Sequence, residues 1–241
     1  MAKVAAKLVS SLPSPSNIFG LDYCLQFYRN KGVFSPTFSL TPVSRHFIRK
    51  QLSCLKIDKS TGLDGISPRF LKDGCELLVD PISHIVNLSL TSEIFPSAFK
   101  KARVKPLFKK GSRLDVGNYR PVSILPVMSK ILERAVNDQL NDYLSSRGLF
   151  YDFQSGFRKG YSTDTCLMNL NDYIKKQTSD GKVTGMILID LQKAFDCVDH
   201  CLLIKKLSAI GVASTDWFRS YLNDRVQCSQ VGGVDSSFFK C

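Results

Sequence analysis

One aspartate, Asp190, follows directly after a short apolar run that covers residues 183–189. An apolar run without polar alternation predicts a strand that is buried on both faces, here 183–190. A carboxylate at the rigid end of such a strand is a good ligand for Mg²⁺, because hard cations prefer carboxylate and backbone oxygens. The alternative interpretation is an ordinary strand-end aspartate that caps the next turn.

Two more carboxylates, Asp196 and Asp199, follow Asp190 closely. Each precedes a stretch with helical spacing, so helix capping or solvation explains them better than metal ligation does. The second stretch predicts a helix that begins at Asp199 or His200 and stops at Gly211.

Positive charge is concentrated in residues 100–120, which hold one acidic residue, Asp115. The pattern of strand 103–108, loop 109–118 and strand 119–125 predicts a hairpin with a basic tip. Charges on a turn project into one small volume, which favours phosphate binding over a solvated charged face. The eight basic residues are Lys100, Lys101, Arg103, Lys105, Lys109, Lys110, Arg113 and Arg120.

A second basic segment, 154–163, reads Gln-Ser-Gly-Phe-Arg-Lys-Gly-Tyr-Ser-Thr. It brings Arg158, Lys159 and two aromatic residues next to a predicted helix start, where free amide groups favour anions. A glycine-rich stretch of this kind is not specific by itself.

Helices are needed to hold these segments in place. Apolar spacing predicts two short helices within 67–93, one helix over 129–147 and another over 163–177. Asp80-Pro81 suits the first turn of a helix. Ser129 is a candidate cap and Gly148 a candidate stop for the helix of 129–147.

The ends of the sequence differ from its middle. Proline and serine clusters in residues 1–54 predict an irregular N-terminal arm, and residues 225–241 alternate around Gly232-Gly233 as a hairpin. We expect an α+β fold in which the helices of 129–147 and 163–177 cover a central strand at 186–190.

The composition indicates a globular chain. Its 241 residues are 44% hydrophobic and 22% charged, with a net charge of +12, which points to nucleic acid first and to an anionic membrane surface second. Eight cysteines without a Cys-x-x-Cys pair, beside three histidines, argue against zinc and favour reduced thiols. No apolar run is long enough to span a membrane and no signal peptide is evident, so we expect a nuclear or cytoplasmic intracellular protein.

The order of five blocks resembles the reverse transcriptase of non-LTR (LINE-type) retrotransposons. The blocks are 59–66 (Lys-Ser-Thr-Gly-Leu-Asp-Gly-Ile), 106–111 (Pro-Leu-Phe-Lys-Lys-Gly), 118–125 (Asn-Tyr-Arg-Pro-Val-Ser-Ile-Leu), 154–158 with Ser162-Thr163, and 188–200 (Leu-Ile-Asp-Leu-Gln-Lys-Ala-Phe-Asp-Cys-Val-Asp-His). The similarity covers about residues 55–240. It implies a partial right-hand polymerase, with fingers at about 67–165, the first part of the palm at about 166–241, and a central antiparallel palm sheet with flanking helices.

The resemblance also implies an activity and a metal site. Such an enzyme adds deoxynucleotides to the 3′ hydroxyl of a DNA primer on an RNA template by two-metal catalysis with Mg²⁺. Asp190 matches the first metal-binding aspartate, with the Leu191 carbonyl beside it. Phe195 matches the aromatic residue that packs under the sugar and excludes a 2′ hydroxyl, although an ordinary core aromatic residue fits the same pattern.

The remaining roles that the resemblance implies concern the substrates. Lys109, Lys110 and Arg120 fall where the fingers hold the incoming deoxynucleoside triphosphate. The block that lines the template contains Gln154, Gly156 and Arg158, with Lys159 next to them.

The sequence departs from the family in its catalytic motifs. A Pro-Gln-Gly block and a Tyr/Phe-x-Asp-Asp turn, which complete the family's site, do not occur in it. We therefore expect a truncated polymerase fragment that is inactive as an isolated chain and binds Mg²⁺ weakly. The alternative is a non-catalytic, nucleic-acid-binding remnant of a retrotransposon; a membrane-binding role has only the charge in its favour, and the oligomeric state is open.

Overall fold

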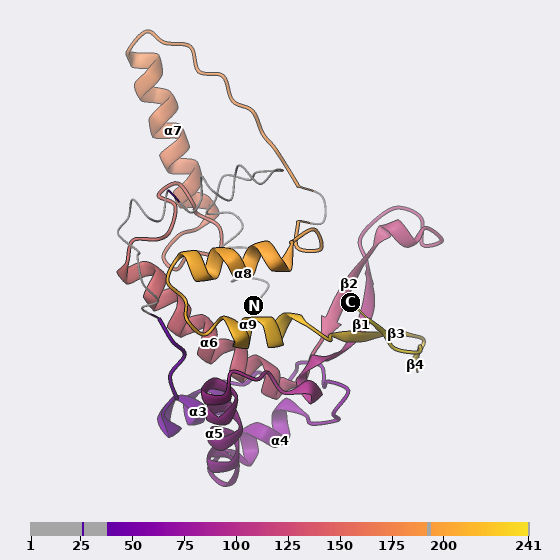
Figure 1. Cartoon of the computed structure of the whole chain (residues 1–241). Coiled ribbons are helices and arrows are strands. Elements are labelled where there is room, and N and C mark those ends of the chain that lie inside the picture. The colour runs from indigo at the N-terminus through magenta and orange to yellow at the C-terminus, as the bar shows by residue number, and fades with distance from the viewer. Residues whose placement is uncertain (1–25, 27–37, 192–193, 241) are drawn as a thin grey trace. The chain divides into compact units, whose positions relative to one another are not determined.

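The computed structural model describes residue 26 and residues 38–191 and 194–240 (Figure 1). The described chain forms two compact units: residues 141–212 belong to one, and residues 38–140 and 213–240 belong to the other. We call them the loop unit and the hairpin unit, respectively.

The hairpin unit begins with three helices, α3 (Arg45–Ser53), α4 (Pro68–Asp73) and α5 (Cys75–Ser92). Ser44 and Ser67 cap the first two, since each serine hydroxyl accepts a hydrogen bond from the backbone amide three residues later. Ile48 and Leu52 of α3 are fully buried. The irregular arm predicted for 1–54 is therefore wrong for residues 45–53, while residues 1–25 and 27–37 lie outside the described part.

The two helices predicted within 67–93 are confirmed as α4 and α5, but they divide at a different residue. They meet at Gly74, and Pro81 lies inside α5 and not in a first turn. Burial explains this difference, because Val79 and Ile82 on either side of Pro81 belong to the core. Packing of that face keeps the helix continuous through a residue that lacks an amide hydrogen.

A cluster of aromatic side chains forms the centre of the hairpin unit. Trp217 of α9 (Thr215–Leu222) is fully buried, stacks on Tyr221 at 5.4 Å and meets the ring of Phe95 edge-on at 5.5 Å. The Trp217 indole donates a hydrogen bond to Ser89 Oγ at 3.1 Å. Burial, followed by the charge of Glu133, raises the pKa of the Tyr221 phenol well above its usual range. Sequence patterns did not predict α9.

A five-stranded sheet completes this unit. The 3-10 turn η1 (Ser97–Lys100) leads into β1 (Lys101–Phe108), which pairs antiparallel with β2 (Tyr119–Ile124) after the 3-10 turn η2 (Val116–Asn118). The strand β3 (Val226–Val231) then pairs parallel with β1. Antiparallel partners of β3 are β4 (Val234–Asp235) and β5 (Phe239–Lys240). Both predicted hairpins are confirmed, whereas the contact that joins them into one mixed sheet was not predicted.

The helix α6 (Val127–Ser146) starts in the hairpin unit and ends in the loop unit. Its predicted apolar stripe is buried, including Leu132, Val136 and Leu140. Ser129 does not cap it, because the helix begins two residues earlier and the Ser129 hydroxyl donates to Glu133 Oε1 at 2.8 Å. The predicted stop at Gly148 is confirmed by its left-handed backbone (φ 59°).

The loop unit contains α7 (Thr163–Ser179) and α8 (His200–Ala209). Ser162 and Thr165 form a reciprocal capping box at the start of α7, and Asp199 caps α8 by accepting a hydrogen bond from the Leu202 amide at 2.9 Å. The Tyr143 hydroxyl donates to the Ile210 carbonyl at 2.6 Å, and Leu203, Leu207 and Ile210 are buried. Both predicted helices are thus confirmed.

The predicted central strand at 186–190 is wrong for this structure. Residues 182–190 form no strand, and the side chains of Ile187, Leu188 and Ile189 are 87%, 84% and 84% exposed. Figure 1 shows this segment running back from the end of α7 as extended chain. The segment pairs with no other described strand, so its backbone makes none of the ladder hydrogen bonds that a central strand has.

Two further expectations change with that strand. No residue of α7 is buried, so this helix does not cover a strand. The sheet that is present is mixed and built from the two hairpins, not an antiparallel sheet around 186–190. The fold is a mixed α/β arrangement with a sheet and flanking helices. The assignment of 186–190 to a palm is supported by motif similarity alone.

Candidate functional site

The basic tip between β1 and β2 is held by hydrogen bonds within the loop. The Lys109 amide donates to the Asn118 carbonyl at 2.8 Å, Asn118 Nδ2 donates to the Ser112 carbonyl at 3.0 Å, and the Tyr119 hydroxyl donates to the Arg113 carbonyl at 2.9 Å. Gly111 has a left-handed backbone (φ 89°), and a Cβ there would lie 2.7 Å from Asn118 Nδ2. The loop is therefore preorganised, with glycine required at its tightest point.

The predicted phosphate-binding side chains all lie on this hairpin. Lys109 and Lys110 are exposed at the tip and Arg120 is exposed on β2. None of the three forms an ion pair with another described residue. Their charges are therefore available to an anionic ligand.

The strand register adds Lys105 to this set. Leu107 lies opposite Arg120 and Lys105 lies opposite Val122, so Lys105 and Arg120 share one face of the hairpin. Arg103 lies on the same face, but its guanidinium pairs with Asp235 at 2.9 Å. The sequence analysis counted Lys105 among the basic residues of 100–120 but did not predict it as a phosphate ligand. Its spacing of two residues from Arg103 on a predicted strand could have indicated that the two share a face.

The block that was predicted to line the template forms a compact loop in the loop unit. Gln154 is only 7% exposed, and its Nε2 donates to the Gly156 carbonyl at 3.1 Å. The Arg158 guanidinium lies over the rings of Tyr161 and Phe150, at 4.3 and 5.4 Å, and its Nη1 approaches the Tyr151 carbonyl at 3.4 Å. Arg158 thus stabilises the loop, whereas Lys159 is exposed.

The candidate metal ligand Asp190 lies in the exposed 182–190 segment, and Leu191 after it is also exposed. No group of three or more histidine, cysteine or acidic side chains that could hold a metal ion occurs in the described residues. Asp190 therefore belongs to no such group there, and a lone carboxylate does not fit a two-magnesium site.

Phe195, the candidate sugar-discriminating residue, contacts the template block. Its ring meets the ring of Phe157 edge-on, with the centroids 6.2 Å apart and an interplanar angle of 78°. Both rings are about half exposed. The structure therefore brings the turn after Asp190 against the loop that contains Gln154 and Arg158.

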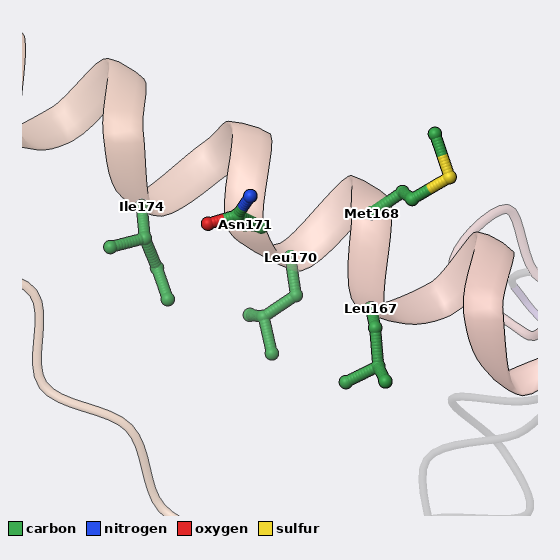
Figure 2. A pocket seen from close by; sticks show the side chains of 5 residues that line it. All are labelled: Leu167, Met168, Leu170, Asn171 and Ile174. Carbon is green, nitrogen blue, oxygen red and sulfur yellow. The ribbon is translucent and has the colours of Figure 1, made fainter.

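One open pocket of about 430 Å³ lies along α7 and is lined by Leu167, Met168, Leu170, Asn171 and Ile174. Figure 2 shows Leu167, Leu170 and Ile174 pointing to one side of the helix and Met168 pointing away. The lining is mostly apolar and contains no titratable group, so nothing in it points to acid–base chemistry. Among the described residues, no helix combines the length and the apolar character that a membrane span requires.

Comparison with known proteins identifies the class. The family model for reverse transcriptase (RNA-dependent DNA polymerase) matches residues 107–239, which include β2, the 154–159 block and Asp190. The chain belongs to this family.

Several curated relatives of the chain are proteins of mobile elements. A probable RNA-directed DNA polymerase from transposon BS of Drosophila melanogaster is 31% identical over 77% of this chain and 21% of its own length. The RNA-directed DNA polymerase from mobile element jockey of Drosophila funebris is 31% identical over 85% of this chain and 22% of its own. These matches confirm the resemblance to non-LTR retrotransposon enzymes, and the chain spans about a fifth of the length of these relatives.

Proposed function

We propose that this chain contributes nucleotide and template binding to an RNA-directed DNA polymerase that extends a DNA primer on an RNA template. The observation that carries the proposal is the family match over 107–239, which spans the second hairpin strand, the 154–159 block and the Asp190 segment in one continuous alignment. Both of these relatives are named as RNA-directed DNA polymerases.

The basic hairpin takes the phosphate groups in this proposal. Lys109, Lys110 and Arg120 are exposed and carry charges that no described acidic residue neutralises. A preorganised tip loses little conformational entropy when it binds. The hairpin holds the triphosphate and adjacent backbone phosphates, while Gln154, Gly156 and Lys159 contribute to the template side.

Asp190 is the metal-ligating carboxylate in this proposal, with the Leu191 carbonyl next to it, and Phe195 lies beside the sugar. Two-metal catalysis requires further carboxylates. The described residues contain no group of three or more candidate ligands that includes Asp190. We accordingly propose that the 241-residue chain by itself gives no templated extension, and that fingers and palm divide at about residue 165.

Nucleic-acid binding tests the proposal directly. The triple variant Lys109→Glu, Lys110→Glu and Arg120→Glu should lose at least tenfold in affinity for an RNA–DNA primer-template and show a shallower salt dependence, because fewer counterions are released. The matched control reverses the exposed helical residues Lys175, Lys176 and Lys205, which changes the net charge equally. Equal losses in both triple variants would show that net charge alone drives binding.

A primer-extension assay with Mg²⁺ tests the catalytic part. Templated synthesis that is lost in Asp190→Asn would contradict the proposed inactivity of the isolated chain. Retained primer-template affinity without synthesis is the expected result, and it also fits a non-catalytic nucleic-acid-binding remnant. Nucleotide binding that depends on Lys109, Lys110 and Arg120 separates the polymerase from that remnant.

A further inference from the structure

The contact between Phe157 and Phe195 joins two segments that are 38 positions apart in the sequence. An edge-to-face pair with centroids 6.2 Å apart lies within the range in which aromatic rings attract each other. Gln192 and Lys193, just before the Phe195 turn, lie outside the described residues. Among the described ring contacts, Phe157 is the one partner of the Phe195 ring.

Phe157 itself is held in an unusual conformation. Its φ of 58° places it in the left-handed region, which phenylalanine rarely adopts. The loop fixes this backbone on both sides. Before it, Gln154 is buried and bonded to the Gly156 carbonyl; after it, the Arg158 guanidinium lies over the Tyr161 ring and the Tyr161 amide donates to the Arg158 carbonyl at 3.3 Å.

Because the backbone is fixed on both sides of Phe157, the direction of its Cα–Cβ bond is fixed as well. That direction is toward Phe195, whose own turn is exposed. The Arg158 guanidinium contacts its own loop, and in this way Arg158 stabilises the backbone that orients the Phe157 ring.

We propose that Phe157 is a positioning residue for Phe195 and that it thereby sets the discrimination between deoxyribose and ribose. This inference rests on the proposed function, in which Phe195 lies beside the sugar of the incoming nucleotide. A ring that excludes a 2′ hydroxyl must be held against sideways movement, and contact with the Phe157 ring does this. Without the Phe157 ring, Phe195 can move aside and a ribonucleotide fits.

The experiment places 4-fluorophenylalanine at position 195 of the full chain and records its ¹⁹F resonance without nucleotide. Phe157→Leu should move this resonance toward its position in the urea-denatured chain, whereas Phe157→Tyr, which keeps the ring, should preserve it. The control Phe153→Leu changes a more exposed phenylalanine of the same loop whose ring contacts Tyr151, and should have no effect. An unchanged resonance in Phe157→Leu would overturn the positioning role.

The same resonance reports nucleotide binding when primer-template is present. The ratio of the apparent Kd values for ATP and dATP, which differ only in the 2′ hydroxyl, should fall by about 2- to 10-fold in Phe157→Leu, the factor that corresponds to the usual worth of an aromatic pair, and should stay constant in Phe153→Leu. A constant ratio in Phe157→Leu would refute the role in sugar selection. If neither nucleotide affects the unsubstituted chain, the proposed nucleotide site and its sugar selection fail, while the nucleotide-free spectra still decide the positioning.

Discussion

Two regions of this chain have similar apolar content but very different environments. In the hairpin unit, Val104 and Ile124 lie in paired strands and are buried, and Trp217 is enclosed by Phe95 and Tyr221. In the loop unit, the run 183–191 is largely exposed and no residue of α7 is buried. Apolar side chains therefore favour burial, but whether they are buried depends on a neighbouring surface that they can pack against.

The contrast also separates the two kinds of candidate site. The phosphate-binding side chains lie on a hairpin whose strands and tip are satisfied by their own hydrogen bonds. Asp190 lies on a segment that forms no strand pairs with other described residues. We therefore expect substitutions at buried positions of the hairpin unit to have large effects on stability, and substitutions in the exposed segment 183–191 to have small effects.

The largest expected effect is that of Trp217→Ala. Removing a fully buried indole that also donates to Ser89 should lower the free energy of unfolding by about 3–5 kcal/mol. Its counterpart Leu188→Ala, at an exposed position, should stay within about 0.5 kcal/mol of the unsubstituted chain. Urea unfolding followed by circular dichroism measures both, and a comparable loss in Leu188→Ala would mean that 183–191 is buried in solution.

Two isoleucines allow the same substitution in a paired strand and in an unpaired run. Ile124→Ala, in β2, should cost about 2–3 kcal/mol, at the lower end of the range for this change because Ile124 is the last residue of its strand. Ile189→Ala should cost less than about 0.5 kcal/mol because its side chain is already exposed. Equal losses of unfolding free energy for the two variants in the same urea experiment would show that Ile189 is as buried as Ile124.

Two glycines with left-handed backbones form a third pair. Gly111→Ala should lower the unfolding free energy by about 2 kcal/mol, because it adds a clash with Asn118 to the backbone strain. Gly181→Ala has open space around the new methyl group and should cost about 1 kcal/mol, from strain alone. Thermal unfolding of the two variants compares them, and a larger cost for Gly181→Ala would contradict the preorganised hairpin tip.

The smallest expected effect is a pH dependence that comes from Tyr221. Because its pKa is raised in the folded chain, the unfolded chain loses the phenol proton first, at about pH 10. Stability from this group is therefore complete below pH 10 and decreases as the pH rises above it, by about 1 kcal/mol per pH unit. The unfolding free energy of Tyr221→Phe should fall less steeply between pH 10 and 11; parallel curves would show that the phenol is not buried.

Local signals in the sequence determined much of this protein. The two hairpins were predicted at the correct turns, Gly148 and Gly211 ended helices as expected, and Asp199 caps α8. These features depend on neighbouring residues, since a cap or a left-handed turn is decided within a few positions. The order of the family motifs was also readable, because it lies in the sequence itself.

Which of these elements are paired and buried depends on tertiary contacts that the sequence patterns do not reveal. The tertiary structure joined β1 to β3 in parallel, built the core around Trp217, kept α5 continuous through Pro81 and used the Arg158 guanidinium within its own loop. It also left 186–190 exposed where the sequence predicted a buried strand. The physical reason is that a strand, unlike a helix, takes its hydrogen bonds from residues distant in the sequence, so its own composition cannot determine whether a partner is present.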